Sequence, residues 1–353
     1  MPADTATRPA TTSHNPSATD AIIEVRGLVK RYGSLTAVDG VDLTVLTGEI
    51  FGILGPNGAG KTTTLEMIEG LRAPDDGTIT VAGLDAVAQS EQVRRVIGVQ
   101  LQTTALFDYL SAAELIELFA GLYDVAAPPD WIDRLLAMVN LQEKRDARVN
   151  ELSGGQRQRL SITLALVNRP TIVFLDEPTT GLDPAARRDL WKAVRDIRAE
   201  GATVVLTTHY MEEAEVLCDR VAVMDRGRVI ACDTPAALIR ALGKSATVRA
   251  HLTGGALAET DLASLPAVTA SHAGGGNGRS AEIELHTTDA QATLVGLLAL
   301  AGRANVTLTD LRSSQASLED VFLSLTGRTY ESGKDGEDGE DEAEGGRRKT
   351  ETD

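Results

Sequence analysis

A glycine-rich segment gives the strongest chemical signal in this sequence of 353 residues. Residues 55–63 are Gly-Pro-Asn-Gly-Ala-Gly-Lys-Thr-Thr, which fits the pattern Gly-x4-Gly-Lys-Ser/Thr between an apolar run and a helical run. Successive backbone N–H groups of such a loop form a nest for phosphate oxygens, and the following helix adds its positive dipole. Lys61 is expected to reach the β- and γ-phosphates, and the Thr62 hydroxyl to coordinate Mg²⁺. The predicted phosphate-binding residues are Gly55, Pro56, Asn57, Gly58, Ala59, Gly60, Lys61, Thr62 and Thr63.

Two adjacent carboxylates follow a second apolar run. Residues 172–177 are Ile-Val-Phe-Leu-Asp-Glu, a buried strand that ends in Asp176 and Glu177. A carboxylate at the end of a strand beside a phosphate loop suits Mg²⁺, so Asp176 is predicted to help hold this ion. Glu177 is then placed to polarise the attacking water. An acidic strand-to-loop junction is also common without any catalytic role, but the phosphate loop upstream favours the catalytic interpretation.

A third segment, residues 152–159, is Leu-Ser-Gly-Gly-Gln-Arg-Gln-Arg and precedes a helical stretch. A serine and two glycines at a helix N-terminus form a second potential anion-binding site. The alternative is an ordinary helix N-cap by Ser153, which this segment alone would favour. The candidate nucleotide-binding residues here are Ser153, Gly154, Gly155 and Gln156.

The elements that must position these residues alternate along the chain. Apolar runs at 50–54, 172–175 and 203–206 are separated by helical stretches, of which 187–198 has clear helical spacing. Buried strands that alternate with helices predict an α/β domain with a largely parallel sheet. We expect this domain to occupy residues 21–243.

The pattern changes after residue 243. Apolar and polar residues alternate near 248–252, 283–285 and 306–308, which predicts half-buried strands, and Leu318, Val321, Phe322 and Leu325 mark an amphipathic helix. We expect a small α+β domain at 244–328, closed by this helix. Residues 1–20 and 329–353 have little to bury and predict a disordered leader and a disordered acidic tail.

The charge balance limits the possible partners. The chain has 51 acidic and 34 basic residues, a net charge of −17, of which residues 331–353 supply −6 through ten acids and four bases. A bulk nucleic-acid binder needs an excess of Lys and Arg, so no nucleic acid is predicted as a partner. No apolar run approaches the roughly 20 residues that cross a bilayer. Two cysteines, Cys218 and Cys232, form no disulfide framework and fit a reducing cytosol.

The phosphate loop, the Leu-Ser-Gly-Gly-Gln segment and the Asp-Glu strand occur in the order found in the ATP-binding cassette (ABC) transporter ATPase subunits, which residues 22–242 closely resemble. The resemblance implies an α/β P-loop NTPase cassette with a RecA-like core, an antiparallel β subdomain and a helical signature subdomain. It implies an ATPase that uses ATP and Mg²⁺.

The resemblance also implies roles for four further residues. Gln102 matches the glutamine that contacts Mg²⁺ and senses the membrane partner, and Asp183 matches the loop that communicates between two nucleotide sites. His209 matches the histidine that contacts the γ-phosphate and acts in catalysis with Glu177 and Lys61. Tyr32 matches the aromatic residue that stacks on adenine.

In this family the Leu-Ser-Gly-Gly-Gln segment, called the signature, of one subunit covers the nucleotide held by the phosphate loop of the other subunit. With one phosphate loop and one signature, this chain is expected to form a head-to-tail homodimer around two ATP molecules. The resemblance further implies a separate integral membrane permease, and hence a location at the cytoplasmic face of the membrane.

Soluble ABC ATPases that act on ribosomes or DNA are the alternative. The former generally have two cassettes in one chain, and the latter usually interrupt the cassette with a coiled coil or zinc modules, for which this chain has no room. Residues 317–327, Ser-Leu-Glu-Asp-Val-Phe-Leu-Ser-Leu-Thr-Gly, and residues 97–107 resemble the daunorubicin-resistance branch of exporters, whose members export drugs, antibiotics, lipids or polysaccharides. Residues 110–114, Leu-Ser-Ala-Ala-Glu, depart from that branch in the region expected to face the permease.

Overall fold

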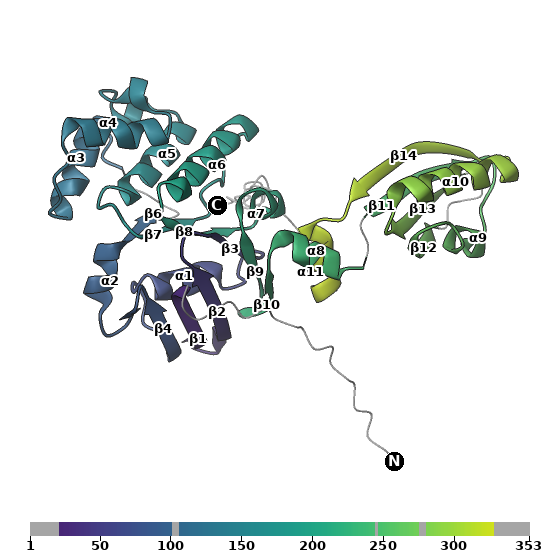
Figure 1. Cartoon of the computed structure of the whole chain (residues 1–353), viewed down its shortest axis with the longest axis horizontal. Coiled ribbons are helices and arrows are strands. Elements are labelled where there is room, and N and C mark those ends of the chain that lie inside the picture. The colour runs from purple at the N-terminus through teal and green to yellow at the C-terminus, as the bar shows by residue number, and fades with distance from the viewer. Residues whose placement is uncertain (1–20, 101–105, 244–245, 275–279, 328–353) are drawn as a thin grey trace, which may run out of the picture.

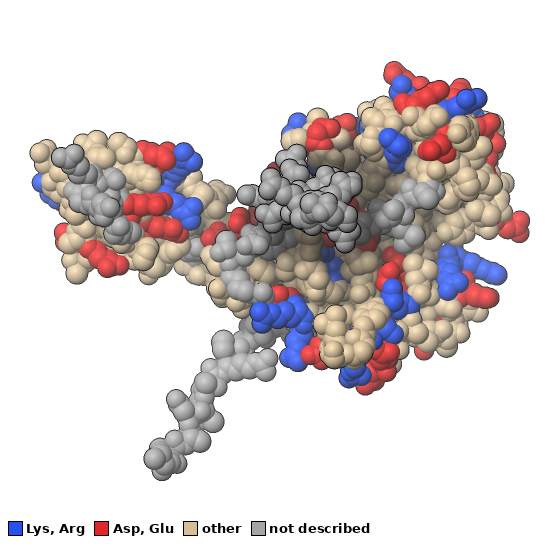
Figure 2. All heavy atoms as spheres, turned by 180° about the vertical axis from the view of Figure 1, so that it is seen from behind, with Lys and Arg blue, Asp and Glu red and all other residues tan. Residues whose placement is uncertain are grey.

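The computed structural model describes residues 21–100, 106–243, 246–274 and 280–327. Figure 1 shows two bodies, a large one that contains the described residues up to 243 and a small one that projects from it. The predicted leader and tail, and Gln102, lie outside the described residues. Figure 2 shows acidic and basic side chains interspersed over the face that it displays, without a continuous basic surface there.

The centre of the large body is a six-stranded sheet in the order β10-β9-β3-β8-β7-β6. All neighbours are parallel except the β9–β10 pair. Side chains along each strand alternate between two hydrophobic clusters: Phe51 and Phe174 enter one, and Ile50 and Leu175 enter the other. Burial on both faces explains why these strands are continuous apolar runs. The strands are β3 (Ile50–Leu54), β6 (Ile97–Gln100), β7 (Ile172–Asp176), β8 (Thr203–Thr208), β9 (Arg220–Asp225) and β10 (Arg228–Asp233).

Helices and a second sheet cover this core (Figure 1). One face packs against the antiparallel sheet β2-β1-β4-β5 through a shared hydrophobic cluster. The strands of this sheet are β1 (Ala21–Tyr32), β2 (Leu35–Leu46), β4 (Asp76–Val81) and β5 (Leu84–Asp85). The helices α1 (Lys61–Ile68) and α2 (Ser90–Val96) contribute to the same hydrophobic cluster. Helices on the other face are α6 (Pro184–Ala199) and α7 (Met211–Leu217).

A helical subdomain lies beside the core and contains the Leu-Ser-Gly-Gly-Gln segment. Its helices are α3 (Ala112–Leu122), α4 (Pro129–Met138) and α5 (Gly154–Ala165), with short 3-10 turns η1 (Gln142–Lys144) and η2 (Val149–Glu151). Ser111 and Glu114 form a reciprocal capping box that starts α3. The predicted cassette with a parallel core, an antiparallel β subdomain and a helical subdomain is therefore confirmed.

The small body is an antiparallel sheet in the order β12-β13-β11-β14, with a hydrophobic cluster of its own. Its strands are β11 (Ala246–Thr253), β12 (Val268–Gly274), β13 (Ser280–Thr287) and β14 (Thr307–Gln315), and its helices are α9 (Glu259–Ala263) and α10 (Ala290–Ala304). The alternation in the sequence predicted β11, β13 and β14. One face of β11 and one face of β13 are buried, whereas β14 is largely exposed.

The last helix corrects one expectation. Helix α11 (Leu318–Thr326) does not close the small domain but packs on the large body, against α7 and α8 (Pro235–Ala241). Leu318, Val321 and Phe322 belong to the hydrophobic cluster of the core sheet. The backbone N–H of Leu318 donates a hydrogen bond of 2.6 Å to Oε1 of Glu215 on α7. Periodicity revealed the apolar face of this helix but not the surface that it covers.

No helix among the described residues is long and apolar enough to cross a membrane.

Candidate nucleotide and catalytic site

The glycine-rich loop connects β3 to α1, as its position in the sequence predicts. Two glycines are required by close backbone approaches: a Cβ on Gly55 would lie 2.4 Å from the carbonyl oxygen of Met224, and one on Gly60 would lie 2.5 Å from that of Ala37. Gly60 also has a φ of 99°, which favours glycine. The tight fit holds the loop beside a cavity of about 230 Å³ that is lined by Asn57, Gly58, Gly60, Lys61, Thr62, Thr63 and Glu177.

Lys61 is almost fully buried, with 4% of its side chain exposed. Its ammonium group donates hydrogen bonds to the carbonyl oxygens of Gly55 at 3.0 Å and Pro56 at 3.3 Å. Its Nζ also lies 3.1 Å from Oε1 of Glu177. The lysine therefore satisfies its three donors within the loop and the carboxylate, and it lines the cavity where phosphates are expected.

The predicted magnesium ligands come together at the same place. The Thr62 hydroxyl lies 3.2 and 3.3 Å from the two carboxylate oxygens of Asp176, and Thr207 also donates a hydrogen bond to Asp176. Burial raises the pKa of Asp176, an effect that the nearby charge of Glu177 increases. A buried carboxylate beside a hydroxyl is a hard-oxygen pair that fits Mg²⁺, which usually takes one or two protein ligands and completes its shell with phosphates and water.

Glu177 is the most strongly perturbed carboxylate of the site. Its Oε2 lies 3.1 Å from Nδ1 of His209, on the loop that follows β8. The hydrogen bond from His209 and the nearby charge of Lys61 lower the pKa of Glu177 to about 2 despite its burial. Its φ of 45° is unusual for a residue other than glycine and marks backbone strain at this position. The side chain is thus an ionised base at the edge of the cavity.

Ser153 and Asp183 lie together in a different pocket, of about 490 Å³, which Gly154, Gly155 and Gln156 also line. Ser153 caps α5, because its Oγ accepts a hydrogen bond from the N–H of Gln156 at 3.3 Å. Asp183 caps α6 in the same way and accepts from Ala185 and Ala186 at 2.8 and 3.0 Å, which lowers its pKa. The capping role that the sequence left open is therefore present, and the exposed Ser153 remains accessible from outside.

Tyr32 ends β1 and is 41% exposed. The cations of Lys30 and Arg72 lie 5.9 and 5.5 Å from the centre of its ring. The ring is thus held at the surface by neighbouring cations, where a flat base can stack on it.

One functional contact escaped the sequence analysis. Besides its bond to Asp176, the Thr207 hydroxyl accepts a hydrogen bond of 3.0 Å from the backbone N–H of Glu177. Thr207 thereby orients both carboxylates. The parallel register that pairs Asp176 with Thr207 creates this contact. The sequence feature that could have revealed this contact was a threonine near the end of β8, the strand that pairs with the Asp-Glu strand.

Comparison with known proteins identifies the family. The sequence model described as "ABC transporter" matches residues 38–180. The Nod factor export ATP-binding protein I of Rhizobium sp. (strain N33) is 40% identical over 311 residues, which cover 88% of this chain and 98% of that protein. The chain belongs to the ABC transporter family. The daunorubicin/doxorubicin resistance ATP-binding protein of Streptomyces peucetius is 40% identical over 309 residues, which cover 86% of this ABC protein and 92% of that one.

Solved structures agree with this assignment. An ATP-binding subunit of an ABC transporter superposes with a TM-score of 0.56 at 30% identity and covers 63% of this chain and 93% of its own. A dimeric ATP-binding cassette, solved in a post-hydrolysis state with ADP and Pi, superposes with a TM-score of 0.54 at 28% identity and covers 60% and 98%. The ABC protein is thus an ATPase that uses ATP and Mg²⁺. Its relatives are ATP-binding proteins of exporters, which supports the predicted class over an ATPase that acts on ribosomes or DNA.

Proposed function

We propose that this ABC protein works as a head-to-tail homodimer that binds two ATP molecules and drives a separate membrane permease. One observation supports this proposal above all: the predicted nucleotide-binding residues fall into two separate pockets of one chain. Lys61 and Glu177 line one pocket, whereas Ser153 and Asp183 line the other. A second copy in head-to-tail orientation would bring the two pockets together around each nucleotide.

The geometry supports a specific division of labour during hydrolysis. Lys61 binds the β- and γ-phosphates, while His209 and Ser153 of the partner subunit stabilise charge on the transferring phosphoryl group. Glu177, already ionised and hydrogen-bonded to His209, orients the water that attacks the phosphorus. Thr62 and Asp176, with Gln102, would hold Mg²⁺, which would supply positive charge to neutralise the phosphates. Tyr32 stacks on the adenine.

Four exposed apolar side chains on α3 and just before it support docking of the permease on the helical subdomain. Phe107 and Tyr109 are 57% and 80% exposed, and Leu118 and Leu122 on α3 are 40% and 73% exposed. Large apolar side chains grouped on an exposed surface mark interaction sites. In the sequence, the segment 110–114, which differs from the daunorubicin-resistance branch, lies between the pair Phe107 and Tyr109 and the pair Leu118 and Leu122. Through this surface the protein would sit at the cytoplasmic face of the membrane.

The cargo belongs to the range that such exporters serve, namely drugs, antibiotics, lipids or polysaccharides. The relatives are named for Nod factor export and for daunorubicin resistance, two chemically different cargoes. Similar ATPases that serve such different cargoes indicate that the permease selects the substrate.

Mixing two inactive variants tests the composite site. Lys61→Ala removes one half of a site and Ser153→Arg blocks the other half, so each homodimer should lack both sites. A mixed dimer should contain one intact site and recover a measurable fraction of the wild-type ATPase rate. Activity in either variant alone, or no recovery in the mixture although light scattering shows dimers with ATP, would contradict the head-to-tail arrangement.

A further inference from the structure

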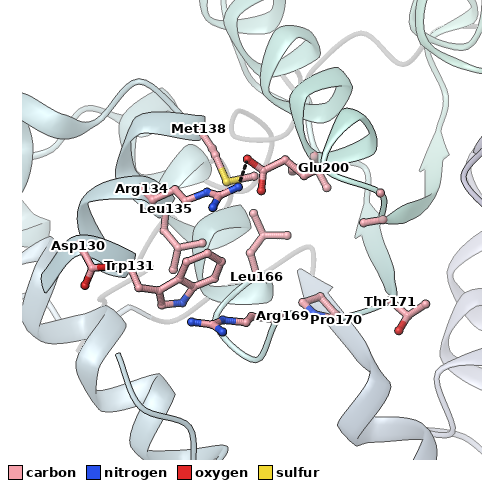
Figure 3. Close-up of a pocket in the computed structure, with 13 residues that line it drawn as sticks. Asp130, Trp131, Arg134, Leu135, Met138, Leu166, Arg169, Pro170, Thr171 and Glu200 are labelled. Carbon is pink, nitrogen blue, oxygen red and sulfur yellow. Dashed lines mark hydrogen bonds and ion pairs between the residues drawn. The ribbon is translucent and has the colours of Figure 1, made fainter. Parts of the chain in front are cut away.

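A third cavity, of about 540 Å³, lies where the helical subdomain meets the core. Three segments line it: one face of α4, the loop between α5 and β7, and the turn between α6 and β8. Figure 3 shows side chains from these segments converging on one space. None of the residues that line it belongs to the predicted nucleotide site.

The inner part of this cavity is apolar. Leu135 and Met138 of α4, Leu166 at the end of α5, and Ile197 of α6 contribute side chains to it. The indole of Trp131 forms a side wall (Figure 3). An apolar floor with one aromatic wall suits a flat or hydrophobic group of a small molecule.

The charges around the cavity are unevenly paired. Arg134 forms an ion pair of 2.9 Å with Glu200, which joins α4 to the end of α6 and neutralises both charges. The guanidinium of Arg169 lies 4.5 Å from the centre of the Trp131 ring and forms no ion pair with any described residue. Figure 3 shows Asp130 on the far side of the indole from the apolar floor. One exposed cation without an ion pair among the described residues therefore lines the cavity.

An unpaired polar atom lies beside that cation. The Nε1–H of Trp131 is buried and has no hydrogen-bond partner among the residues that the structure describes. Buried donors are usually paired. Figure 3 shows the indole nitrogen on the side of the ring that faces Arg169. An acidic group bound by Arg169 would therefore approach the same side of the indole as this N–H.

We propose that this cavity binds a small anionic molecule with an aromatic or apolar body. Its ring lies against the indole of Trp131 and the apolar floor, and its acidic group binds the guanidinium of Arg169. The ion pair between Arg134 and Glu200 closes one side. The ligand is thus distinct in chemistry and place from ATP, because one cation and an apolar floor do not match a triphosphate.

The position of the cavity predicts an effect on hydrolysis. Helix α5 starts at the signature and ends at the cavity, α6 starts after Asp183 and ends there, and β7 starts there and ends at Asp176. A strand of five residues spans about 16 Å, so the cavity and the proposed catalytic carboxylates lie at opposite ends of β7. A ligand that bridges α4 to the core therefore changes the ATPase rate by restricting movement between them.

Two probes with the same ring and opposite charge test the binding. 2-Naphthoate should quench the fluorescence of Trp131 saturably and bind at least about tenfold more tightly than 2-naphthylmethylamine. Arg169→Gln should abolish this preference and Arg169→Glu should reverse it. Arg303→Glu, at an exposed position on α10, makes the same charge change elsewhere and should leave the preference intact. Equal binding of the two probes, no saturable binding, or undiminished preference in both Arg169 variants would overturn the proposal.

The ATPase assay tests the regulatory part separately. Saturating 2-naphthoate should change the rate at least about twofold in the wild type and in Arg303→Glu, but not in Arg169→Gln. Binding without any change of rate would overturn regulation, while the binding site itself would stand. Because the binding measurement does not need a composite nucleotide site, its outcome is independent of the proposed dimer.

Discussion

Nζ of Lys61 lies 3.1 Å from Oε1 of Glu177, so the lysine of the glycine-rich loop and the proposed catalytic base form a buried ion pair beside the cavity. Removing one partner of a buried ion pair is unfavourable, because the other charge is then buried without compensation. In the proposed mechanism, phosphates that enter the cavity attract Lys61 away from Glu177 and leave the carboxylate to orient water. Nucleotide binding and activation of the base are therefore linked by one side chain.

Glu177→Gln should bind ATP at least as tightly as the wild type and lose turnover by about 10²–10⁴-fold. The amide keeps the shape of the side chain. Because it is neutral, it forms no ion pair with Lys61 and cannot act as a base toward water. Equilibrium binding of ATP and single-turnover hydrolysis measure the two effects. Rapid hydrolysis by the variant would show that another group acts as the base.

Lys61→Ala should weaken ATP binding at least about tenfold, because it removes the cation that faces the phosphates. The variant also leaves Glu177 with His209 as its remaining charged partner. Fluorescence titration with a nucleotide analogue measures the dissociation constant. Lys192→Ala, the same change at an exposed position on α6, is the matched control and should bind ATP within about twofold of the wild type. Normal binding by Lys61→Ala would contradict the phosphate-loop assignment.

Glu69 should make stability depend on pH. Burial and the nearby charge of Asp176 raise the pKa of this carboxyl to about 8. The carboxyl of Glu69 therefore loses its proton at lower pH in the unfolded chain than in the folded chain. The free energy of unfolding should decline as the pH rises from about 5 to 8, by up to about 1.4 kcal/mol per pH unit. Glu69→Gln, which cannot ionise, should remove this decline. Urea unfolding at several pH values tests it, and an equal slope in both proteins would refute the prediction.

Phe322→Ala should destabilise the large body by about 3–5 kcal/mol, although the residue follows the small domain in sequence. Phe322 is 3% exposed and packs in the cluster of the core sheet. Leu323→Ala, at a neighbour that is 43% exposed, should cost far less. Thermal unfolding followed with and without ATP tests this pair. Equal melting temperatures for the two variants would mean that α11 does not stabilise the cassette.

The local patterns of the sequence determined the cassette and most of its site. The phosphate loop at 55–63, the Asp176-Glu177 pair and the segment at 152–159 each need only short spacings, because neighbouring residues on one turn or strand end form each feature. The apolar runs also predicted the parallel core sheet and strands of the small domain, since burial on one or two faces leaves its own period in the sequence, whereas the antiparallel sheet of the cassette was implied only by the family resemblance.

Tertiary structure decided which of these parts meet. Glu177 contacts Lys61, His209 and Thr207 because parallel strands bring their carboxyl ends to one edge of the sheet, whatever their distance along the chain. Helix α11 packs on the core rather than on the small domain, since an apolar face can bury itself on any complementary surface. The cavity at Trp131 and the separation of Ser153 from Lys61 likewise arise from packing between distant segments, which no local period records.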